Sequence, residues 1–129
     1  MSKKEIKHPD KEVDTGAYSA GLEIDGWVYV SGQGPLDLKT GAVIRGTIEE
    51  ETRTTLENVE KILNAGGCTL SDVVKCTVHL ADINDFDRYN QAYLAYFGDH
   101  RPLPTRTTVQ SGLTLGIKVE IDCVAKKQN

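Results

Sequence analysis

The segment VVKCTVHLAD, residues 73–82, decides the fold class because its apolar and polar residues alternate. Strict alternation is typical of a half-buried β-strand, whose successive side chains point to opposite faces. The apolar, inward face is expected to consist of Val74, Cys76, Val78 and Leu80. The outward face is expected to consist of Lys75, Thr77 and His79. A strand with one apolar face needs a second layer to cover it.

Upstream of this strand, the sequence predicts a helix. Thr47 and Glu50 have the T-x-x-E form of a capping box, and Gly66-Gly67 is suited to end a helix. The residues between them that recur at helical spacing are Ile48, Thr52, Thr55, Leu56, Val59, Ile62 and Leu63. This stripe is wide enough to cover part of a sheet.

Downstream of the strand, a second helix is expected. Asn84 or Asp85 can cap its start, and Gly98 closes it. Its apolar face is expected to consist of Phe86, Tyr89, Tyr93 and Phe97. Two helices around one alternating strand indicate a layered protein in which helices pack on a sheet.

Other segments complete a predicted order of β-β-α-β-α-β-β in one domain spanning residues 1–129, with a loose polar arm at 1–17. The further strands are expected within GWVYVSGQGP (26–35), LKTGAVI (38–44), RPLPTRTTVQ (101–110) and IKVEIDCVA (117–125). In the first of these, Trp27 and Tyr29 lie on one face, and Val28 and Val30 on the other. Because both faces are apolar, we expect this strand to be covered on both sides.

Composition excludes several classes of protein. The 129 residues suit a single domain, and 39% hydrophobic with 26% charged residues are globular values. The net charge is −4 and no basic stripe is present, so nucleic-acid binding is not expected. Three cysteines without a CxxC pair indicate reduced thiols. No signal peptide or membrane-length apolar span is found, which predicts a cytoplasmic protein that does not bind membranes.

No motif in the sequence predicts a metal site or an activated nucleophile. The three histidines fall in unrelated elements and are expected to be solvated at the surface: His8, His79 and His100. No serine lies in a G-x-S-x-G elbow, and SGQGP lacks the phosphate-binding G-x-x-x-x-G-K-[ST] pattern. Cys76 and Cys123 fall on the apolar sides of their strands and are expected to be buried structural thiols.

One charge stands out, Arg106 in the strand PTRTTVQ (104–110). If this strand pairs antiparallel with the last strand across the loop 112–116, Arg106 comes near Glu120 or Asp122. A guanidinium is a planar fork suited to a carboxylate. The pattern leaves two interpretations open, an ordinary cross-strand ion pair and a charge that binds a ligand.

The sequence resembles the RidA/YjgF family, the reactive intermediate deaminases, from Tyr18 to Ala125. The resemblance rests on eight segments in the right order. They are GAYSAG (16–21), VSGQGPLD (30–37), TGAV (40–43), ENVEKIL (57–63), VVKCTVHLADINDF (73–86), YNQAYLAYF (89–97), PTRTTV (104–109) and VEID (119–122).

The resemblance implies a chorismate-mutase-like α+β fold, in which a mixed sheet carries two helices on one face. It also implies a homotrimer around a barrel-like core, with active sites in the clefts between subunits. Members of the family hydrolyse 2-imino or 2-enamino acids, such as 2-aminoacrylate, to 2-keto acids and ammonia. No metal or organic cofactor is implied.

The resemblance also implies residue roles. The substrate-carboxylate arginine of the family falls on Arg106, and its water-positioning glutamate falls on Glu120. Further pocket residues would be Tyr18, Ser31, Gly32, Asn90 and Thr108. Thr108 stands where the family often has cysteine, and Ala17 where proline often precedes the tyrosine. Three alternatives stay open: a 2-aminomuconate-type deaminase with a larger substrate, an RNA-cleaving translation inhibitor, and a non-catalytic sensor of small acids.

Overall fold

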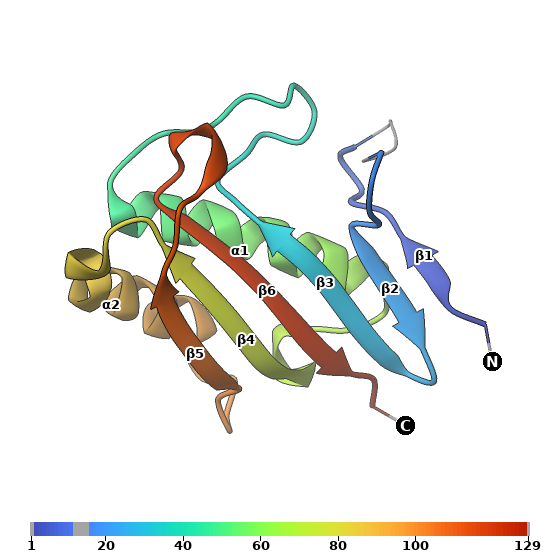
Figure 1. The fold of residues 1–129 in the computed structure, drawn as a ribbon. Coiled ribbons are helices and arrows are strands. Elements are labelled where there is room, and N and C mark those ends of the chain that lie inside the picture. The colour runs from blue at the N-terminus through green and yellow to red at the C-terminus, as the bar shows by residue number, and fades with distance from the viewer. Residues whose placement is uncertain (1, 12–15, 129) are drawn as a thin grey trace.

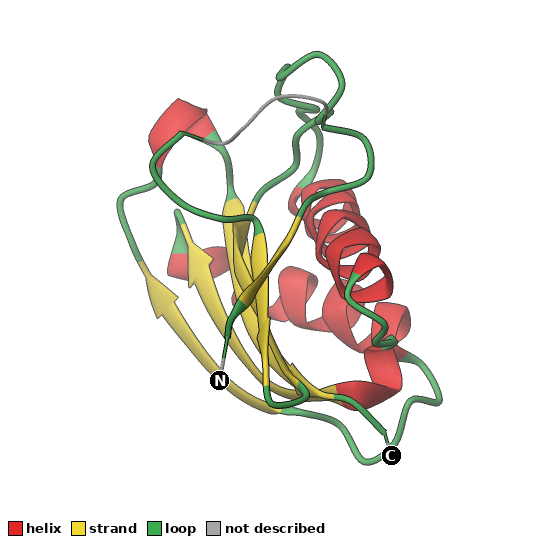
Figure 2. Cartoon of the chain, turned by 90° about the vertical axis from the view of Figure 1, so that its right-hand side faces the viewer, coloured by secondary structure: helices red, strands yellow, loops and turns green. Residues whose placement is uncertain are grey.

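The computed structural model describes residues 2–11 and 16–128, which form a six-stranded sheet with two helices on one face (Figures 1 and 2). The strands are β1 (Lys4–Ile6), β2 (Gly21–Ile24), β3 (Trp27–Gln33), β4 (Val73–Leu80), β5 (Thr105–Gln110) and β6 (Val119–Lys126). The helices are α1 (Ile48–Ala65) and α2 (Phe86–Phe97). The sheet order is β1-β2-β3-β6-β4-β5, in which β4 and β5 are parallel and the other neighbours antiparallel. The predicted mixed α+β architecture is confirmed.

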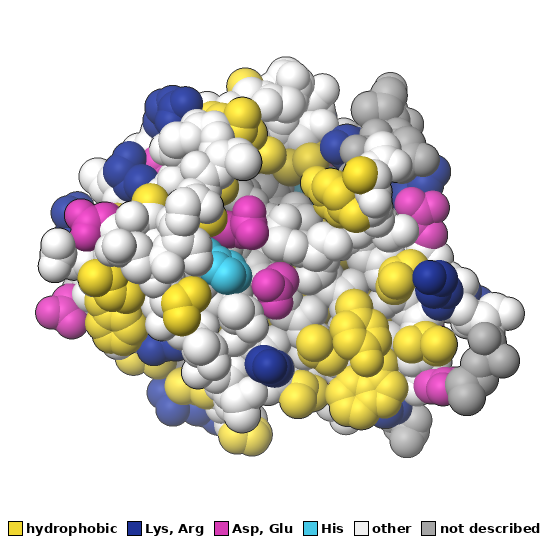
Figure 3. All heavy atoms as spheres, in the orientation of Figure 1, with side chains coloured by type: hydrophobic (Ala, Val, Ile, Leu, Met, Phe, Trp, Pro, Cys, Tyr) yellow, Lys and Arg dark blue, Asp and Glu magenta, His cyan; other side chains and the backbone are white. Residues whose placement is uncertain are grey.

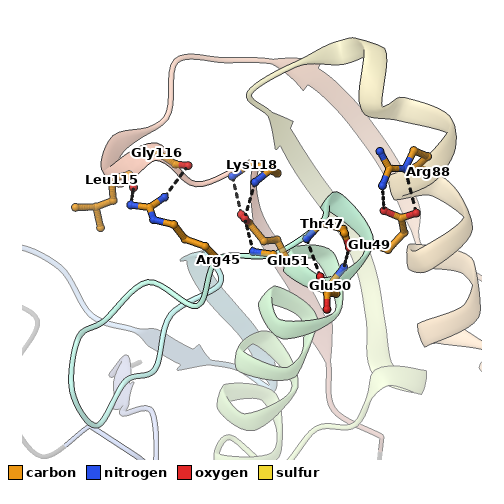
Figure 4. Close-up of polar contacts among 10 residues, drawn as sticks. Arg45, Thr47, Glu49, Glu50, Glu51, Arg88, Leu115, Gly116 and Lys118 are labelled. Atoms are coloured by element: carbon orange, nitrogen blue, oxygen red, sulfur yellow. Dashed lines mark hydrogen bonds and ion pairs between the residues drawn. The ribbon is translucent and has the colours of Figure 1, made fainter.

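Both helices begin and end where the sequence predicts. At the start of α1, Thr47 Oγ1 accepts from the Glu50 backbone N–H at 3.1 Å, and Glu50 Oε1 accepts from the Thr47 N–H at 2.8 Å (Figure 4). This is the predicted capping box, which satisfies two N–H groups that the first turn leaves without partners. Gly66 ends α1, and Gly98, with φ of 55°, ends α2.

The N-terminal half of the sheet differs from the prediction. Part of the arm expected to be loose forms β1, which pairs antiparallel with β2 and buries Ile6. The strand expected over residues 38–44 is instead a loop held by a single bridge between Leu36 and Val43. The chain instead makes a tight turn at Thr40-Gly41, with Gly41 at φ of 79°, which leaves too few residues for a ladder.

The apolar face of β4 is also shifted at its first residues. Cys76, Val78 and Leu80 are buried as predicted, but Val73 is buried and Val74 is 43% exposed. The register between β4 and β6 shifts between Val73 and Lys75, so one extra residue bulges out of the ladder. A bulge reverses the alternation on one side of it, which a strict period of two does not anticipate.

The largest correction concerns β5. The sequence analysis supposed that β5 pairs antiparallel with β6, but β4 lies between them, and β5 is an edge strand parallel to β4. Arg106 is in register with Cys76, whereas Glu120 is in register with His79. The reason is the α2 crossover, because a strand that returns after a helix usually lies parallel to the strand before it. The chain then crosses over the end of the sheet and inserts β6 between β3 and β4.

Only one face of the sheet is covered within the chain. The core between sheet and helices contains Val28, Val30 and the buried side chains of both helices. On the open face, Trp27 is 37% exposed and Tyr29 is 45% exposed, so the expected cover on both sides of β3 is not found in the single chain. Figure 3 shows hydrophobic side chains gathered on this face near the β2–β3 hairpin. Within the described residues, no helix combines the length and apolarity needed to span a bilayer.

Candidate functional site

The predicted site residues fall into two groups on opposite faces of the sheet. The Arg106 side chain lies on the helix face, beside α2. Glu120 lies on the open face, because it is half-exposed and alternates with the buried Val119 and Ile121. The structure therefore does not bring Arg106 and Glu120 together within one chain. The cross-strand ion pair, one of the two interpretations left open by the sequence, is absent from the described residues. We call the two groups the arginine half-site and the glutamate half-site.

The arginine half-site is a cage of aromatic rings around a guanidinium. The Arg106 Cζ lies 4.8 Å from the ring centroid of Tyr93, 5.3 Å from that of Tyr89 and 5.7 Å from that of Phe86. Its Nη1 donates to Asn90 Oδ1 at 2.8 Å. A cation over the face of a ring is attracted by the ring quadrupole. Among the described residues, Arg106 has no carboxylate partner, so most of its N–H donors are left for a ligand.

Helix periodicity and strand alternation together build this half-site. Residues three and four apart lie on the same face of a helix, which places the cage residues in one row along α2. That row is Phe86, Tyr89, Asn90 and Tyr93. On β5, Thr108 lies two residues after Arg106 and so points to the same face. The Thr108 and Tyr89 hydroxyls are hydrogen-bonded at 2.8 Å. Asn90 and Thr108, both predicted site residues, thus lie next to Arg106 or its cage.

The glutamate half-site surrounds a hollow on the open face of the sheet. The hollow has a volume of about 570 Å³, and its lining includes Tyr18, Ser31, Gly32 and Asp122. Ser31 Oγ donates to the Ser19 carbonyl at 2.6 Å, which ties the segment carrying Tyr18 to β3. Three predicted residues from two separate segments of the sequence, Tyr18 and the pair Ser31-Gly32, therefore lie around one hollow.

A close approach between two strands places Glu120 beside this hollow. The β3–β6 register shifts between Val30 and Gln33, and Gly32 lies in that irregular stretch. A Cβ at Gly32 would lie 2.7 Å from Glu120 Oε2 and 3.0 Å from its Cδ. The Glu120 carboxylate therefore lies directly over the Gly32 backbone, in space that only glycine leaves free.

The electrostatics of the open face come from β4 and β6. Burial raises the pKa of Asp122, and the charges of His79 and Lys75 oppose this shift. His79 Nδ1 is hydrogen-bonded to Ser111 Oγ at 2.8 Å, so the imidazole is oriented by the loop that follows β5. Figure 3 shows acidic and histidine side chains together over the middle of this face.

The cysteines take no part in either half-site as nucleophiles. Cys68, Cys76 and Cys123 are free and buried, as predicted for the last two. Burial raises the pKa of Cys76 to about 11 and the pKa of Cys123 well above its ordinary value. A thiolate is the reactive form, and burial disfavours it.

A buried carboxylate that the sequence analysis missed holds the loops at one end of the sheet. Glu51 is 0% exposed, and its Oε1 accepts from the Lys118 N–H at 2.9 Å. Its Oε2 accepts from Lys118 Nζ at 3.0 Å and from the Gly46 N–H at 3.2 Å (Figure 4). Arg45 adds bonds to the Leu115 and Gly116 carbonyls at 2.9 and 3.2 Å. We call these bonds of Glu51 and Arg45 the clamp. The clamp fixes residue 118, where the chain enters β6 toward Glu120.

The prediction of surface histidines is wrong for His8, which is 2% exposed. Its Nδ1 accepts from the Asp10 N–H at 3.1 Å, so its Nε2 carries the proton and donates to Asn58 Oδ1 at 3.0 Å. Asn58 Nδ2 in turn donates to the Gly34 and Leu36 carbonyls. Burial lowers the pKa of His8. Across residues 2–11 and 16–128, no cluster of three or more metal-ligating side chains is found.

Comparison with known proteins identifies the family. The sequence model of the Endoribonuclease L-PSP family matches residues 10–127. The chain therefore belongs to the RidA/YjgF family. A RutC family protein of Pyrococcus horikoshii is 40% identical over 113 residues, which cover 88% of this chain and 89% of that relative. The 2-iminobutanoate/2-iminopropanoate deaminase of Rattus norvegicus is 42% identical over 111 residues, covering 85% of this chain and 80% of the relative.

Solved structures agree with this assignment. The crystal structure of E. coli TdcF with bound serine aligns with a TM-score of 0.88 at 33% identity, over 97% of this chain and 99% of that chain. The yeast Mmf1 crystal structure aligns with a TM-score of 0.89 at 27% identity, over 98% of this chain and all of that one. The RidA/YjgF fold thus accounts for the whole sheet and both helices.

Proposed function

We propose that this RidA/YjgF protein hydrolyses small 2-imino and 2-enamino acids to 2-keto acids and ammonia. The observation that carries the proposal is Arg106, a half-buried guanidinium held by rings and one amide, most of whose donors have no partner among the described residues. Such a group suits the carboxylate that every 2-imino acid carries. The deaminase name of the rat relative and the serine bound to TdcF support a small substrate of this kind.

We further propose that the working site forms between copies of the chain in a homotrimer. The two half-sites lie on opposite faces of one sheet, so one chain cannot present both to one small molecule. The open face also exposes Trp27 and Tyr29, apolar surface of the kind that subunit contacts bury. A second copy that covers this face and brings its own β5 edge would join Arg106 of one chain to Glu120 of another.

The chemistry needs only binding, water placement and proton transfer. Arg106 would hold the substrate carboxylate. Glu120 would accept a proton from a water molecule while the water oxygen bonds to C2 of the substrate. The C=N electron pair moves to nitrogen, which takes a proton, giving a carbinolamine. Protonation of the amine and loss of a hydroxyl proton then release ammonia and leave the 2-keto acid. Imines hydrolyse in water unaided, so modest positioning suffices.

Turnover of freshly generated 2-iminobutanoate tests this proposal. Arg106→Ala is expected to abolish the acceleration, and Arg106→Lys to restore little, because an ammonium lacks the planar fork. Glu120→Gln is expected to keep ligand binding while turnover falls by about a hundredfold. Thr107→Val, on the other face of β5, is the matched control. Unchanged turnover in Arg106→Ala would contradict the assignment, and a panel of larger enamines would reveal an aminomuconate-type preference.

A mixing experiment tests the shared site. Arg106→Ala and Glu120→Gln chains, each inactive alone, are coexpressed with different tags and purified as mixed oligomers. If each site takes its arginine and glutamate from different chains, random mixing is expected to restore about a quarter of the sites. Mixed oligomers that stay inactive would overturn the shared site without bearing on Arg106→Ala alone.

RNA cleavage is a second candidate, favoured by the description of the matched family as an endoribonuclease. The net charge of −4 counts against it, because RNA binding draws on basic surface. Filter binding at physiological salt separates the two: tight RNA binding that Arg106→Ala leaves intact would support this candidate over the deaminase.

A further inference from the structure

Tyr89 makes two contacts in the arginine half-site, and the sequence analysis assigned it only to the core. Its side chain is fully buried, and its ring centroid lies 5.3 Å from the Arg106 Cζ. Its hydroxyl is hydrogen-bonded to Thr108 Oγ1 at 2.8 Å. One residue of α2 therefore touches both inward-pointing polar side chains in this part of β5.

We infer that Tyr89 and Thr108 act together as positioning residues that hold the Arg106 guanidinium in the pose that binds a carboxylate. The inference rests on the proposed function and deepens it. Neither residue needs to touch the substrate, because both act through the arginine.

The ring arrangement makes Tyr89 the centre of the cage. Its centroid lies 5.7 Å from that of Phe86 and 5.9 Å from that of Tyr93, the two other rings around the guanidinium. A change in the tilt of the middle ring therefore alters the surface that Arg106 rests on. Its far end is fixed by Thr108, which is anchored on the same strand as Arg106. Strand, guanidinium, ring and hydroxyl thus form a closed set of contacts.

This arrangement explains why a threonine is suited to position 108. The phenol oxygen of Tyr89 lies in a buried side chain, and a buried hydroxyl without a hydrogen-bond partner is destabilising. A threonine hydroxyl is a full hydrogen-bond partner, whereas a thiol is a weak one. The raised pKa of Tyr89, caused by burial, keeps the phenol protonated and able to donate. A chain with tyrosine at 89 thus has a use for a hydroxyl at 108.

The experiment compares variants that remove or replace the hydroxyl groups of residues 89 and 108, using two independent measurements. The variants are Tyr89→Phe, Thr108→Val, Thr108→Cys and Thr108→Ser. The first measurement is KM against kcat for 2-iminobutanoate. The second is the NMR signal of the Arg106 Nε–H during titration with 2-oxobutanoate, which reports carboxylate binding without turnover. The matched control is Tyr96→Phe. Tyr96 lies on α2 like Tyr89, and its phenol hydroxyl is hydrogen-bonded to Glu60 of α1 at 2.5 Å.

Tyr89→Phe and Thr108→Val are expected to raise KM and the Kd for 2-oxobutanoate about three- to tenfold, with kcat within about twofold, since one hydrogen bond is lost. Thr108→Ser is expected to match the parent protein, and Thr108→Cys to lie between. Tyr96→Phe is expected to leave KM, Kd and the Arg106 signal unchanged.

Other outcomes separate this inference from the proposed function. If Tyr89→Phe and Thr108→Val bind 2-oxobutanoate as tightly as the parent, the hydroxyl pair only stabilises the fold and the inference is overturned. Should Thr108→Val unfold, Tyr89→Phe decides alone, because the half-exposed Thr108 hydroxyl it leaves can reach water. If the parent protein shows no Arg106 signal change with any 2-keto acid, the proposed function fails first and this inference falls with it.

Discussion

The two half-sites are built by different means. In the arginine half-site, side chains do the positioning. Three rings and an amide surround one guanidinium, and a hydroxyl pair ties one of these rings to β5. In the glutamate half-site, backbone shape does the positioning, through the irregular stretch of β3 and the loops that lead into β6. Substitutions in the first are therefore expected to act locally on binding. Substitutions in the second are expected to act through the backbone and the loops that place Glu120.

The largest effect is expected from Glu51, whose carboxylate satisfies two backbone N–H groups and one ammonium. Glu51→Ala leaves these buried or half-buried donors without their acceptor, and is expected to lower the free energy of unfolding by about 3 kcal/mol. Urea denaturation measures this change. Turnover is expected to fall as well, while the Arg106 Nε–H signal stays in place, because the cage on α2 does not depend on the clamp.

The control for this prediction is Glu49→Ala, two residues away on α1. Glu49 pairs with Arg88 at 2.8 Å, but both side chains are substantially exposed. Its loss is expected to lower the free energy of unfolding far less than the loss of Glu51, because solvent screens an exposed ion pair. An equal decrease in the free energy of unfolding in both variants would show that Glu51 stabilises the loops no more than an exposed ion pair does. It would also weaken the contrast between the half-sites.

Gly32→Ala is expected to have the next largest effect, and on activity rather than on stability. The added methyl would lie 2.7 Å from Glu120 Oε2, so the carboxylate must move away. If Glu120 positions the water as proposed, this displacement is expected to lower kcat about ten- to a hundredfold. Gly112→Ala is the control, since a Cβ there meets nothing within 4 Å. If Gly32→Ala keeps its kcat, Glu120 does not act from the position it has in this structure.

Local parts of the molecule could be predicted from the sequence, and long-range parts could not. The capping box of α1 and the aromatic stripe of α2 depend on residues three or four apart, so the periodicity was sufficient. The pairing of β5 was wrong because the sequence does not show that β6 inserts between β3 and β4. The bulge at Val74 is likewise a long-range feature, set by the β6 ladder.

The same distinction applies to the candidate site. The resemblance selected residues that fall into two coherent half-sites, but their roles stay predictions. A signal for Glu51 was present, because it lies at helical spacing between Ile48 and Thr55 on the predicted apolar face. Nothing comparable marked His8, because its burial depends on a contact with Asn58, fifty positions along the chain.

A smaller effect is expected for His8, which supports the turn after β3 through Asn58. Because burial lowers its pKa, the unfolded chain binds a proton more readily than the folded one. Stability is therefore expected to fall as the pH drops through about 6.5, the unfolded value. Thermal unfolding between pH 7.5 and 5 measures this, with His8→Gln expected to remove the dependence. If His100→Gln, at the surface near Ser71, removed it instead, the assignment to His8 would be wrong.

The smallest effect on stability is expected at Asp122, a partly buried carboxylate on the open face. Burial raises its pKa above the unfolded value, so the folded chain binds the proton more tightly and stability falls as the pH rises through this window. Asp122→Asn removes the ionised carboxylate and is expected to raise Tm at pH 7 by a few degrees at most. The gain should vanish at acidic pH, where Asp122 is itself neutral, and Asp99→Asn should show neither change. A lowered Tm at pH 7 would mean that the contacts with His79 and Lys75 outweigh burial, and that charge rather than exclusion of water shapes the glutamate half-site.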